Sequence, residues 1–374
     1  MSKIGGMQRV GIDLLHQLEQ HRDTTVETVI LRSARENDYL GFLPFLVRAF
    51  FTARSLMQAD KIDVVLFSAM PSAVLAPVLS GVARKTRIPL AAISHGHDVI
   101  AQNALYQWVV RQVLDRLDAM LPVSRSTGEQ CLERGLSQDR LFVTPNGIDP
   151  DRFGHSYPGI VINLVARRAV LGEAFPQLAE KISPSSLVLC SVGRQVKRKG
   201  HEWFIRHVMP ALNPNVHLVL GGKGPETDSI RQAVTDTGLQ SRVHLLGIVP
   251  EEKLASLYTG GDLFVMPNIK VEGDMEGFGV VMLEAGLCGM AAIAARLEGI
   301  QDVVTDGKNG FNVDAMDIAG YKKLIDRFAD NLDLLDPLYA SSRVHTIETF
   351  SWPQIAARII DTLSTVVRRK RGQV

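Results

Sequence analysis

The sequence predicts an α/β protein of two domains, each with a parallel β-sheet covered by helices. Short runs of β-branched and other apolar residues alternate with longer amphipathic stretches along nearly the whole chain, as parallel βαβ units require. The chain has 374 residues, which is more than one α/β domain usually needs. Hydrophobic residues make up 46% of it and charged residues 22%, so both domains can have a packed core.

Strands are expected at residues 26–31, 64–67, 90–94, 119–123 and 141–145, and then at 187–192, 216–220, 243–246, 263–266 and 291–295. Helices are expected at residues 10–18, 72–84, 128–134, 203–212, 229–237, 251–258 and 352–367. The stretch Asn146-Gly147-Ile148-Asp149-Pro150 and the variable residues after it indicate a domain boundary. We therefore expect an N-terminal domain at 1–155, a C-terminal domain at 156–350 and a final helical segment at 351–374.

Composition excludes several classes of protein. The net charge of +1 and the pI near 7.8 do not indicate a nucleic-acid-binding protein. The cysteines Cys131, Cys190 and Cys288 lie far apart without metal-ligand or disulfide spacing, which is typical of the reducing cytoplasm. No signal peptide is expected at residues 1–10. Residues 64–83 carry no charge, but Pro71 and Pro77 favour a buried strand followed by a helix over a membrane span.

The N-terminus contains a glycine pair, Gly5-Gly6, ahead of the helix expected at 10–18. Such a pair could be a turn that approaches a phosphate after a first strand, or simply a flexible terminus. Residues 1–4 are too short for that strand, which is usually central in a doubly wound sheet. We therefore expect either that the natural chain begins upstream of Met1 or that this half-domain is incomplete.

Two glutamates flank a glycine-rich helix start in the second half. Gly277-Phe278-Gly279 follows the strand at 263–266 and opens a helix that runs to Leu287. Open α/β sheets bind ligands at such strand-to-helix corners, where backbone N–H groups favour a phosphate. Glu276, before the helix, can contact sugar hydroxyls, and Glu284, about two turns along, can accept hydrogen bonds from a ribose diol. Alone, such glutamates are more often a helix-start carboxylate and a solvated residue; the flanking glycines favour binding.

A basic loop follows the strand at 187–192 and contains Arg194 and Lys199. These cations can neutralise a diphosphate, Arg194 in a bidentate manner and Lys199 as a point charge. Held in place, they would stabilise the negative charge that develops on a diphosphate leaving group. Taken alone, however, a run of basic residues is more often solvated surface than a binding site.

Two further turns follow predicted strands. His95 comes directly after the strand at 90–94, where an imidazole can bind a substrate hydroxyl or phosphate, although loop histidines are more often structural. The turn Gly221-Gly222-Lys223-Gly224 lacks both the third glycine of a dinucleotide fingerprint and the Lys-Ser/Thr pair of a P-loop. We interpret it as a turn beside the site. The absence of a dinucleotide fingerprint also argues against a dehydrogenase.

Residues 39–54 mix aromatic, aliphatic and basic side chains. This pattern fits a helix on a membrane surface beside a lipid acceptor, and equally a core helix with arginines that reach into solvent. The basic tail Arg368-Arg369-Lys370-Arg371 favours membrane contact slightly.

Together these motifs resemble the GT-B glycosyltransferases of family 4, the glycosyl transferases group 1. The matching elements occur in family order over nearly the whole chain: Gly5-Gly6, His95-Gly96 before Asp98, Val123-Ser124, Pro145-Asn146-Gly147-Ile148-Asp149, Gly193-Arg194 with Lys199-Gly200, Glu276 to Glu284, Asp306-Gly307 before Asn309-Gly310, and Phe350-Ser351-Trp352. Each motif is weak by itself, but their order and spacing are specific.

The resemblance implies a GT-B fold, in which two Rossmann-like domains face a central cleft and the final helix crosses back to the first domain. It implies a nucleoside-diphosphate sugar donor and transfer with retention, without a metal or other cofactor. It assigns the diphosphate to Arg194 and Lys199, the donor sugar to Glu276 and the ribose to Glu284. It further places His95 near the transferred sugar and assigns backbone contacts with the donor phosphate to Gly6. Leu297-Glu298-Gly299-Ile300 departs from the family's usual double glycine, and Gly289-Met290-Ala291 from its usual proline.

The sequence thus predicts transfer of a hexose from a UDP- or GDP-sugar to a glycan or lipid-linked acceptor, in envelope polysaccharide or lipopolysaccharide synthesis. The expected location is the cytoplasm, at the inner face of the membrane. One alternative is a non-catalytic protein that binds nucleotide sugars or serves as a scaffold. Another is a different GT-B enzyme, such as a sugar-nucleotide epimerase or a phosphorylase.

Overall fold

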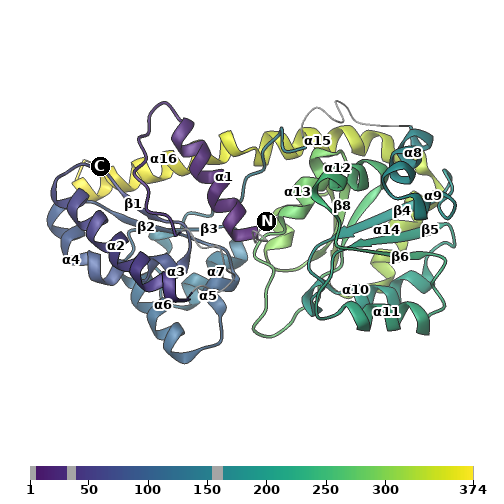
Figure 1. Ribbon diagram of the computed structural model, residues 1–374, viewed down its shortest axis with the longest axis horizontal. Helices are drawn as coiled ribbons and strands as arrows, with labels where there is room; N and C mark the ends of the chain where they lie inside the picture. The colour runs from purple at the N-terminus through teal and green to yellow at the C-terminus, as the bar shows by residue number, and fades with distance from the viewer. Residues whose placement is uncertain (1–5, 32–38, 154–162, 374) are drawn as a thin grey trace. The chain divides into compact units, whose positions relative to one another are not determined.

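The computed structural model describes residues 6–31, 39–153 and 163–373 and divides into two compact units (Figure 1). Unit 1 comprises residues 1–147 and 352–374, and unit 2 comprises residues 148–351. The boundary between the two units therefore lies after residue 147, earlier than the boundary expected after residue 155. It does so because Ile148 already pairs within unit 2, where its N–H donates to the carbonyl of Phe350 at 2.8 Å.

Unit 1 contains a parallel sheet with the strand order β1-β2-β3, formed by β1 (Val65–Phe67), β2 (Leu90–Ser94) and β3 (Ala119–Pro122). Its helices are α1 (Gly6–Gln20), α2 (Tyr39–Gln58), α3 (Met70–Ala73), α4 (Ala76–Thr86), α5 (His97–Ile100), α6 (Ala104–Arg116), α7 (Arg125–Glu133), η1 (Gln138–Arg140) and α16 (Trp352–Arg371). All residues of β2 are buried, as expected for a central strand of a parallel sheet. The strands expected at 64–67, 90–94 and 119–123 are confirmed.

Two other strands expected in unit 1 do not form. Residues 26–31 have no ladder partner in the described part of the chain, and Ile30 and Leu31 remain 43% and 38% exposed. An apolar run becomes a strand only when a neighbouring backbone completes its hydrogen bonds. Residues 141–145 run beside β3 and donate two backbone hydrogen bonds to it, but only Leu141 forms a β-bridge, with Met120.

The helix expected at 72–84 is divided into α3 and α4. Pro77 lies in the first turn of α4. Proline has no N–H to continue a helix but fits a first turn, so a new helix begins there. Among the described residues, no helix has the length and hydropathy that a membrane span requires.

The last helix, α16, belongs to unit 1 by its contacts. It buries one face along its length, including Trp352, Ile359 and Val366. A Cβ on Gly147 would lie 2.3 Å from the ring of Trp352, so only glycine fits between the first unit's last loop and the start of α16. At the other end, Lys370 forms an ion pair with Asp118 at 2.5 Å.

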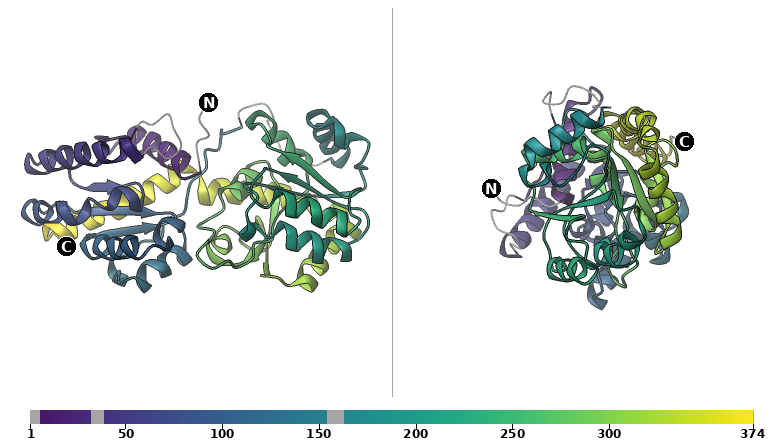
Figure 2. Two further views of the ribbon diagram at one scale, coloured as in Figure 1. Left: turned by 60° about the horizontal axis from the view of Figure 1, so that its bottom comes forward. Right: turned by 90° about the vertical axis from the view of Figure 1, so that its right-hand side faces the viewer.

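Unit 2 has a parallel sheet with the order β6-β5-β4-β7-β8-β9. The strands are β4 (Leu187–Val192), β5 (Val216–Gly221), β6 (Val243–Gly247), β7 (Leu263–Met266), β8 (Ala291–Arg296) and β9 (Gly310–Asp314). The helices and helical turns are α8 (Leu164–Ala174), α9 (Pro176–Ala179), η3 (Lys197–Lys199), α10 (His201–Trp203), η4 (Phe204–Val208), η5 (Met209–Ala211), α11 (Thr227–Asp236), α12 (Glu251–Gly260), α13 (Val280–Leu287), η6 (Glu298–Asp302), α14 (Ile318–Asp330), η7 (Leu332–Leu335) and α15 (Asp336–Phe350). Figure 2 shows helices on both sides of this sheet.

All strands expected in unit 2 are confirmed, and β9 is an additional one. The helix expected at 203–212 is instead a succession of α10, the π-helical turn η4 and the 3₁₀ turn η5. Pro210 contributes to this break because it lacks the N–H of a regular helix.

The strand order of unit 2 places a topological switch point between β4 and β7. The chain proceeds from β4 outward to β5 and β6, then returns to the other side of β4 and proceeds through β7, β8 and β9. Ligands of doubly wound sheets bind at the carboxyl ends of the two strands that flank such a point. The loops after β4 and β7 therefore form the candidate site.

Candidate functional site

The loops after β4 and β7 lie directly against one another. Gly200 has a φ of +66°, and a Cβ there would lie 2.0 Å from the carbonyl oxygen of Pro267. The N–H of Ile269 donates to the carbonyl of Arg198 at 2.9 Å. Glycine at position 200 is thus required both by its left-handed backbone and by the close approach of the second loop. This approach brings the basic loop to the loop that carries Glu276.

Four charged side chains meet between these loops. Lys199 Nζ lies 2.7 Å from Glu276 Oε2, and Arg198 Nε lies 3.3 Å from the same oxygen. Arg198 also donates to both carboxylate oxygens of Asp274 at 3.1 Å. The side chains of Lys199 and Glu276 are 11% and 13% exposed, so their attraction is weakly screened. Arg198 and Asp274 were not predicted as site residues, and only the pairing of the two loops identifies them.

Glu276 is held as a carboxylate by this cluster. Its burial acts to raise its pKa, but the adjacent charges of Lys199 and Arg198 more than offset burial, and the pKa lies below its ordinary value. An ionised carboxylate only accepts hydrogen bonds, which suits contact with hydroxyl groups. The ammonium of Lys199 has three donors, so two remain for another ligand.

Helix α13 begins beside this cluster. Gly279 precedes its first residue with a φ of +92°, a conformation that glycine adopts without strain. The side chain of Phe278 is buried and packs against Phe350 with ring centroids 6.0 Å apart. Phe278 can therefore offer a ligand its backbone but not its ring. The amides of residues 277–279 precede the positive end of the helix, as phosphate binding requires.

Glu284 is not the solvated residue that one interpretation of the sequence allowed. Its residue exposure is 7%, its Oε1 lies 2.6 Å from Arg152 Nη2, and its Oε2 accepts a hydrogen bond from Tyr258 at 3.1 Å. Burial and the carboxylate of Glu284 raise the pKa of Tyr258, so this hydroxyl remains a donor. Arg152 follows the Asn146–Pro150 motif and Tyr258 lies on α12, and no local pattern marked either residue.

The remaining predicted residues have different surroundings. The side chain of Arg194 is exposed and forms no ion pair with any described residue. The turn after β5 supports its loop, because the N–H of Gln195 donates to the carbonyl of Lys223 at 3.2 Å. A Cβ on Gly222 would lie 1.9 Å from the carbonyl oxygen of Gly193, so this turn packs on the basic loop as a structural element.

His95 and Gly6 belong to unit 1. His95 Nε2 lies 3.0 Å from the carbonyl oxygen of Ser68 and donates a hydrogen bond to it, because a carbonyl oxygen only accepts. The His95 N–H donates to Asp98 at 2.8 Å, which fixes the turn after β2. Gly6 is the first residue of α1, and Gly5 lies outside the described residues.

Comparison with known proteins gives two family matches. The family described as "Glycosyl transferases group 1" matches residues 177–343, and the one described as "Glycosyltransferase Family 4" matches residues 4–152. A GDP-mannose-dependent α-(1-6)-phosphatidylinositol monomannoside mannosyltransferase of Mycolicibacterium smegmatis is 27% identical over 324 residues, covering 83% of this chain and 78% of that protein. The α-maltose-1-phosphate synthase of the same organism is 29% identical over 272 residues, covering 68% and 65%.

Solved structures share the fold. HepE from Anabaena, in complex with UDP, has a TM-score of 0.71 and 21% identity, covering 98% of both chains. Sucrose-phosphate synthase from Thermosynechococcus elongatus has a TM-score of 0.64 and 19% identity, covering 96% of this chain and 92% of the other.

Proposed function

Because this chain belongs to the GT-B glycosyltransferases of family 4, we propose that it transfers a hexose from a UDP- or GDP-linked sugar with retention of anomeric configuration. The acceptor in this proposal is a glycan or lipid-linked sugar of envelope polysaccharide or lipopolysaccharide synthesis. The observation that carries the proposal is the buried Lys199–Glu276 pair at the switch point of unit 2. In the proposal, Lys199 contacts the phosphate of such a donor and Glu276 contacts its sugar.

The charges of the cluster support a division of roles. Arg198 and Lys199 are balanced by Asp274 and Glu276, so this group is close to neutral. The exposed Arg194 supplies the positive charge that the diphosphate still needs. In the proposal, Lys199 and Arg194 hold the diphosphate, and the amides of residues 277–279 add to them.

The carboxylate of Glu276 accepts hydrogen bonds from sugar hydroxyls, and that of Glu284, which is paired with Arg152, accepts from the ribose. As the bond between the anomeric carbon and the phosphate breaks, the leaving oxygen takes the proton of the acceptor hydroxyl that forms the new bond on the same face. Cations at the diphosphate stabilise the charge that develops there, and His95 is proposed to contact the transferred sugar. Gly6 is proposed to offer its backbone to the donor phosphate.

A donor panel tests the proposal. GDP-mannose and UDP-glucose come first, because a relative depends on GDP-mannose and HepE binds UDP-glucose. We expect release of GDP or UDP from one of them in the presence of acceptor, and an α-linked product from an α-linked donor. We also propose that no metal or cofactor is needed, so activity should persist in EDTA. Donor binding without turnover would instead support a scaffold, and an altered free sugar nucleotide would support an epimerase.

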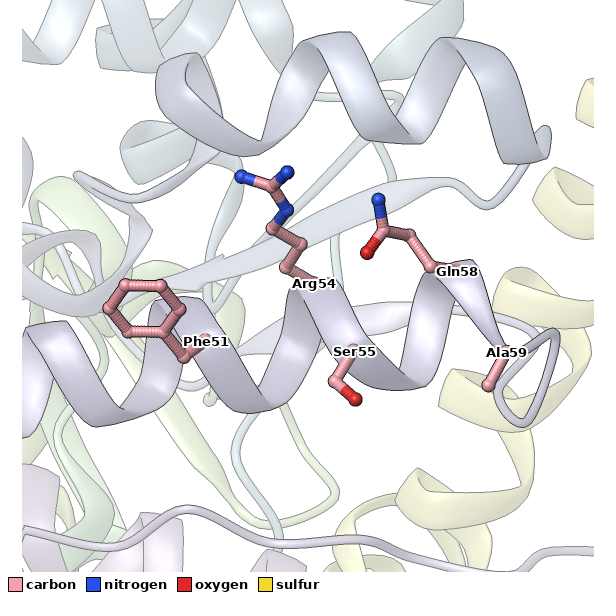
Figure 3. A pocket seen from close by; sticks show the side chains of 5 residues that line it. All are labelled: Phe51, Arg54, Ser55, Gln58 and Ala59. Atoms are coloured by element: carbon pink, nitrogen blue, oxygen red, sulfur yellow. The ribbon is translucent and has the colours of Figure 1, made fainter.

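Contact with a membrane surface is proposed for α2. Leu43, Val47 and Phe51 are 68%, 49% and 63% exposed, and their spacing of four residues places them along one side of the helix. Phe51 and Arg54 line a shallow pocket of about 380 Å³ with Ser55, Gln58 and Ala59, and Figure 3 shows Arg54 and Gln58 extending to the same side of α2. An apolar stripe beside a cation suits the boundary between acyl chains and anionic headgroups.

Cosedimentation with vesicles of phosphatidylcholine and phosphatidylglycerol tests this contact. We expect the protein to sediment with the vesicles and the triple variant Leu43→Ser/Val47→Ser/Phe51→Ser to remain in the supernatant. Val78→Ser is the matched control, since Val78 is 61% exposed on α4 of the same unit. Equal sedimentation of the triple variant and the wild type would contradict the assignment of α2.

A further inference from the structure

We propose that Glu298 is a positioning residue that holds the backbone of Glu276 in place for the donor sugar. This inference rests on the proposed function, because the role of Glu276 in sugar binding belongs to it. Glu298 is the first residue of η6, directly after β8 and Leu297. The loop after β8 thereby becomes a third contributor to the site at the switch point, beside the loops after β4 and β7.

Glu298 and Gly299 engage both main-chain groups of Glu276. The N–H of Glu276 donates to Glu298 Oε2 at 2.6 Å, and the N–H of Gly299 donates to the carbonyl of Glu276 at 3.1 Å. The carboxylate of Glu276 is separately bound by Lys199 and Arg198. Glu276 is therefore fixed at its amide, its carbonyl and its side chain, and the first two contacts come from one dipeptide.

The backbone of Glu298 is strained. Its φ is +51°, in the left-handed region that glycine adopts freely and other residues avoid. Asp60, Arg87 and Met316 are the other non-glycine residues with positive φ in the described part of the chain. Strained residues persist where the surroundings require a particular geometry, often at ligand sites. At position 298, a glycine would relieve the strain but would lose the carboxylate that binds the Glu276 amide.

The electrostatic surroundings of Glu298 also disfavour its carboxylate, which argues against a purely stabilising role. Burial raises the pKa of Glu298, and the carboxylates of Glu276 and Asp274 add to this, while the Glu276 amide and Arg198 act in the opposite direction. A third carboxylate is thus placed beside two others although repulsion opposes it. Both the strain and the repulsion are costs to stability, which are characteristic of a residue retained for the geometry of a site.

Glu298→Gly and Met316→Gly form a matched pair that tests this inference. Both variants remove a non-glycine residue at positive φ in unit 2, but Met316 is an exposed turn residue 55% accessible to solvent. We expect Met316→Gly to raise Tm by a few degrees and to leave transfer unchanged. We expect Glu298→Gly to keep a Tm at or above that of the wild type, yet to lose roughly ten- to a hundredfold in kcat with the sugar donor, since small displacements of a positioning group cost that much.

Three further readouts separate positioning from general damage. Affinity for the nucleoside diphosphate, which lacks the sugar, should change less than about threefold in Glu298→Gly, because the effect acts through Glu276. Glu298→Gln retains an acceptor oxygen and should restore most of kcat. Amide hydrogen exchange at Glu276, measured without any ligand, should accelerate about tenfold or more in Glu298→Gly but not in Met316→Gly.

These outcomes separate the inference from the proposed function. If exchange at the Glu276 amide is unchanged in Glu298→Gly, or if its kcat equals that of the wild type, the positioning role is wrong. Equal losses in kcat and in nucleoside-diphosphate affinity would also overturn it. If no donor is turned over by the wild type, the proposed function fails, while the exchange measurement still decides whether Glu298 fixes the Glu276 backbone.

Discussion

Replacement of Lys199 by methionine perturbs the proposed site most directly. Methionine keeps an unbranched apolar side chain of similar length and removes the ammonium that lies 2.7 Å from Glu276. The side chains of Lys199 and Glu276 are both almost fully buried. In the variant, Glu276 keeps one ionic partner, Arg198 at 3.3 Å. The matched control is Lys197→Met, which removes an exposed cation from the same helical turn.

The expected loss of stability follows from this geometry. Removal of one member of a buried ion pair costs about 3–5 kcal/mol when the other charge is left without a partner. Arg198 continues to offset the charge of Glu276, so we expect about half of that value, ~2 kcal/mol. Urea unfolding should show a lower midpoint for Lys199→Met and no change for Lys197→Met.

The expected functional loss is larger. Removal of one fixed donor to a developing anion typically costs about a hundred- to a thousandfold in kcat. We expect kcat/KM for the sugar donor to fall by about that factor in Lys199→Met, and nucleoside-diphosphate affinity to fall about tenfold, as for loss of one charge-assisted contact. Nucleotide-release kinetics measure kcat/KM, and calorimetric titration measures the affinity for the nucleoside diphosphate.

The pH dependence should change as well. In the wild type, the lowered pKa of Glu276 contributes stability that is present above its unfolded pKa and is lost as pH falls through its lower folded value. Without Lys199, burial is less opposed and the pKa of Glu276 rises, so the variant should lose less stability than the wild type as pH falls. Its activity, which needs the carboxylate, should be lost at a higher pH than in the wild type. If Lys199→Met matched Lys197→Met in unfolding midpoint, diphosphate affinity and kcat/KM, the proposed diphosphate site would be refuted.

Three other predictions concern the same unit. Arg194→Ala should weaken diphosphate binding about tenfold without lowering the unfolding midpoint, because its side chain is exposed; unchanged affinity by calorimetry would remove it from the site. Glu276→Gln should reduce kcat by a larger factor than nucleoside-diphosphate affinity, and the opposite order in kinetics and titration would contradict a contact to the sugar. His217 and His244 are stacked with their nearest ring nitrogens 3.1 Å apart, and burial, followed by the charges of His217 and Lys181, lowers the pKa of His244 to about 4. Stability should therefore fall as pH drops below about 6.5, by about 1 to 2 kcal/mol at pH 5 after allowance for partial solvent screening, and urea unfolding of His244→Gln should show a flatter pH dependence.

Buried parallel strands could be located from the sequence because each is a short apolar run between turn residues. β2, β4 and β7 begin and end at the predicted residues. Residues 26–31 have a similar composition, but strand formation also needs a partner backbone, which a local pattern does not contain. β9 was missed for the converse reason, since its sequence GFNVD is mixed in polarity and its ladder with β8 makes it a strand.

The candidate site, too, could be predicted only in part. Lys199, Glu276 and Glu284 could be selected from the sequence, because strand ends, glycines and helix starts are local features. The contacts of Arg198 with Asp274, of Arg152 with Glu284 and of Glu298 with the Glu276 amide could not, because these partners are distant in the chain.

Residue types and their order thus determined the strands β4 to β8 of unit 2, the start of α13 and the set of candidate charges, since these depend on neighbours within a few residues. The tertiary structure decided that Lys199 is buried against Glu276 while Arg194 stays exposed, although both belong to one basic loop. The physical reason is that the energy of a charge depends on its distance to partners and on its removal from water, and both are set by how the loops after β4, β7 and β8 pack together.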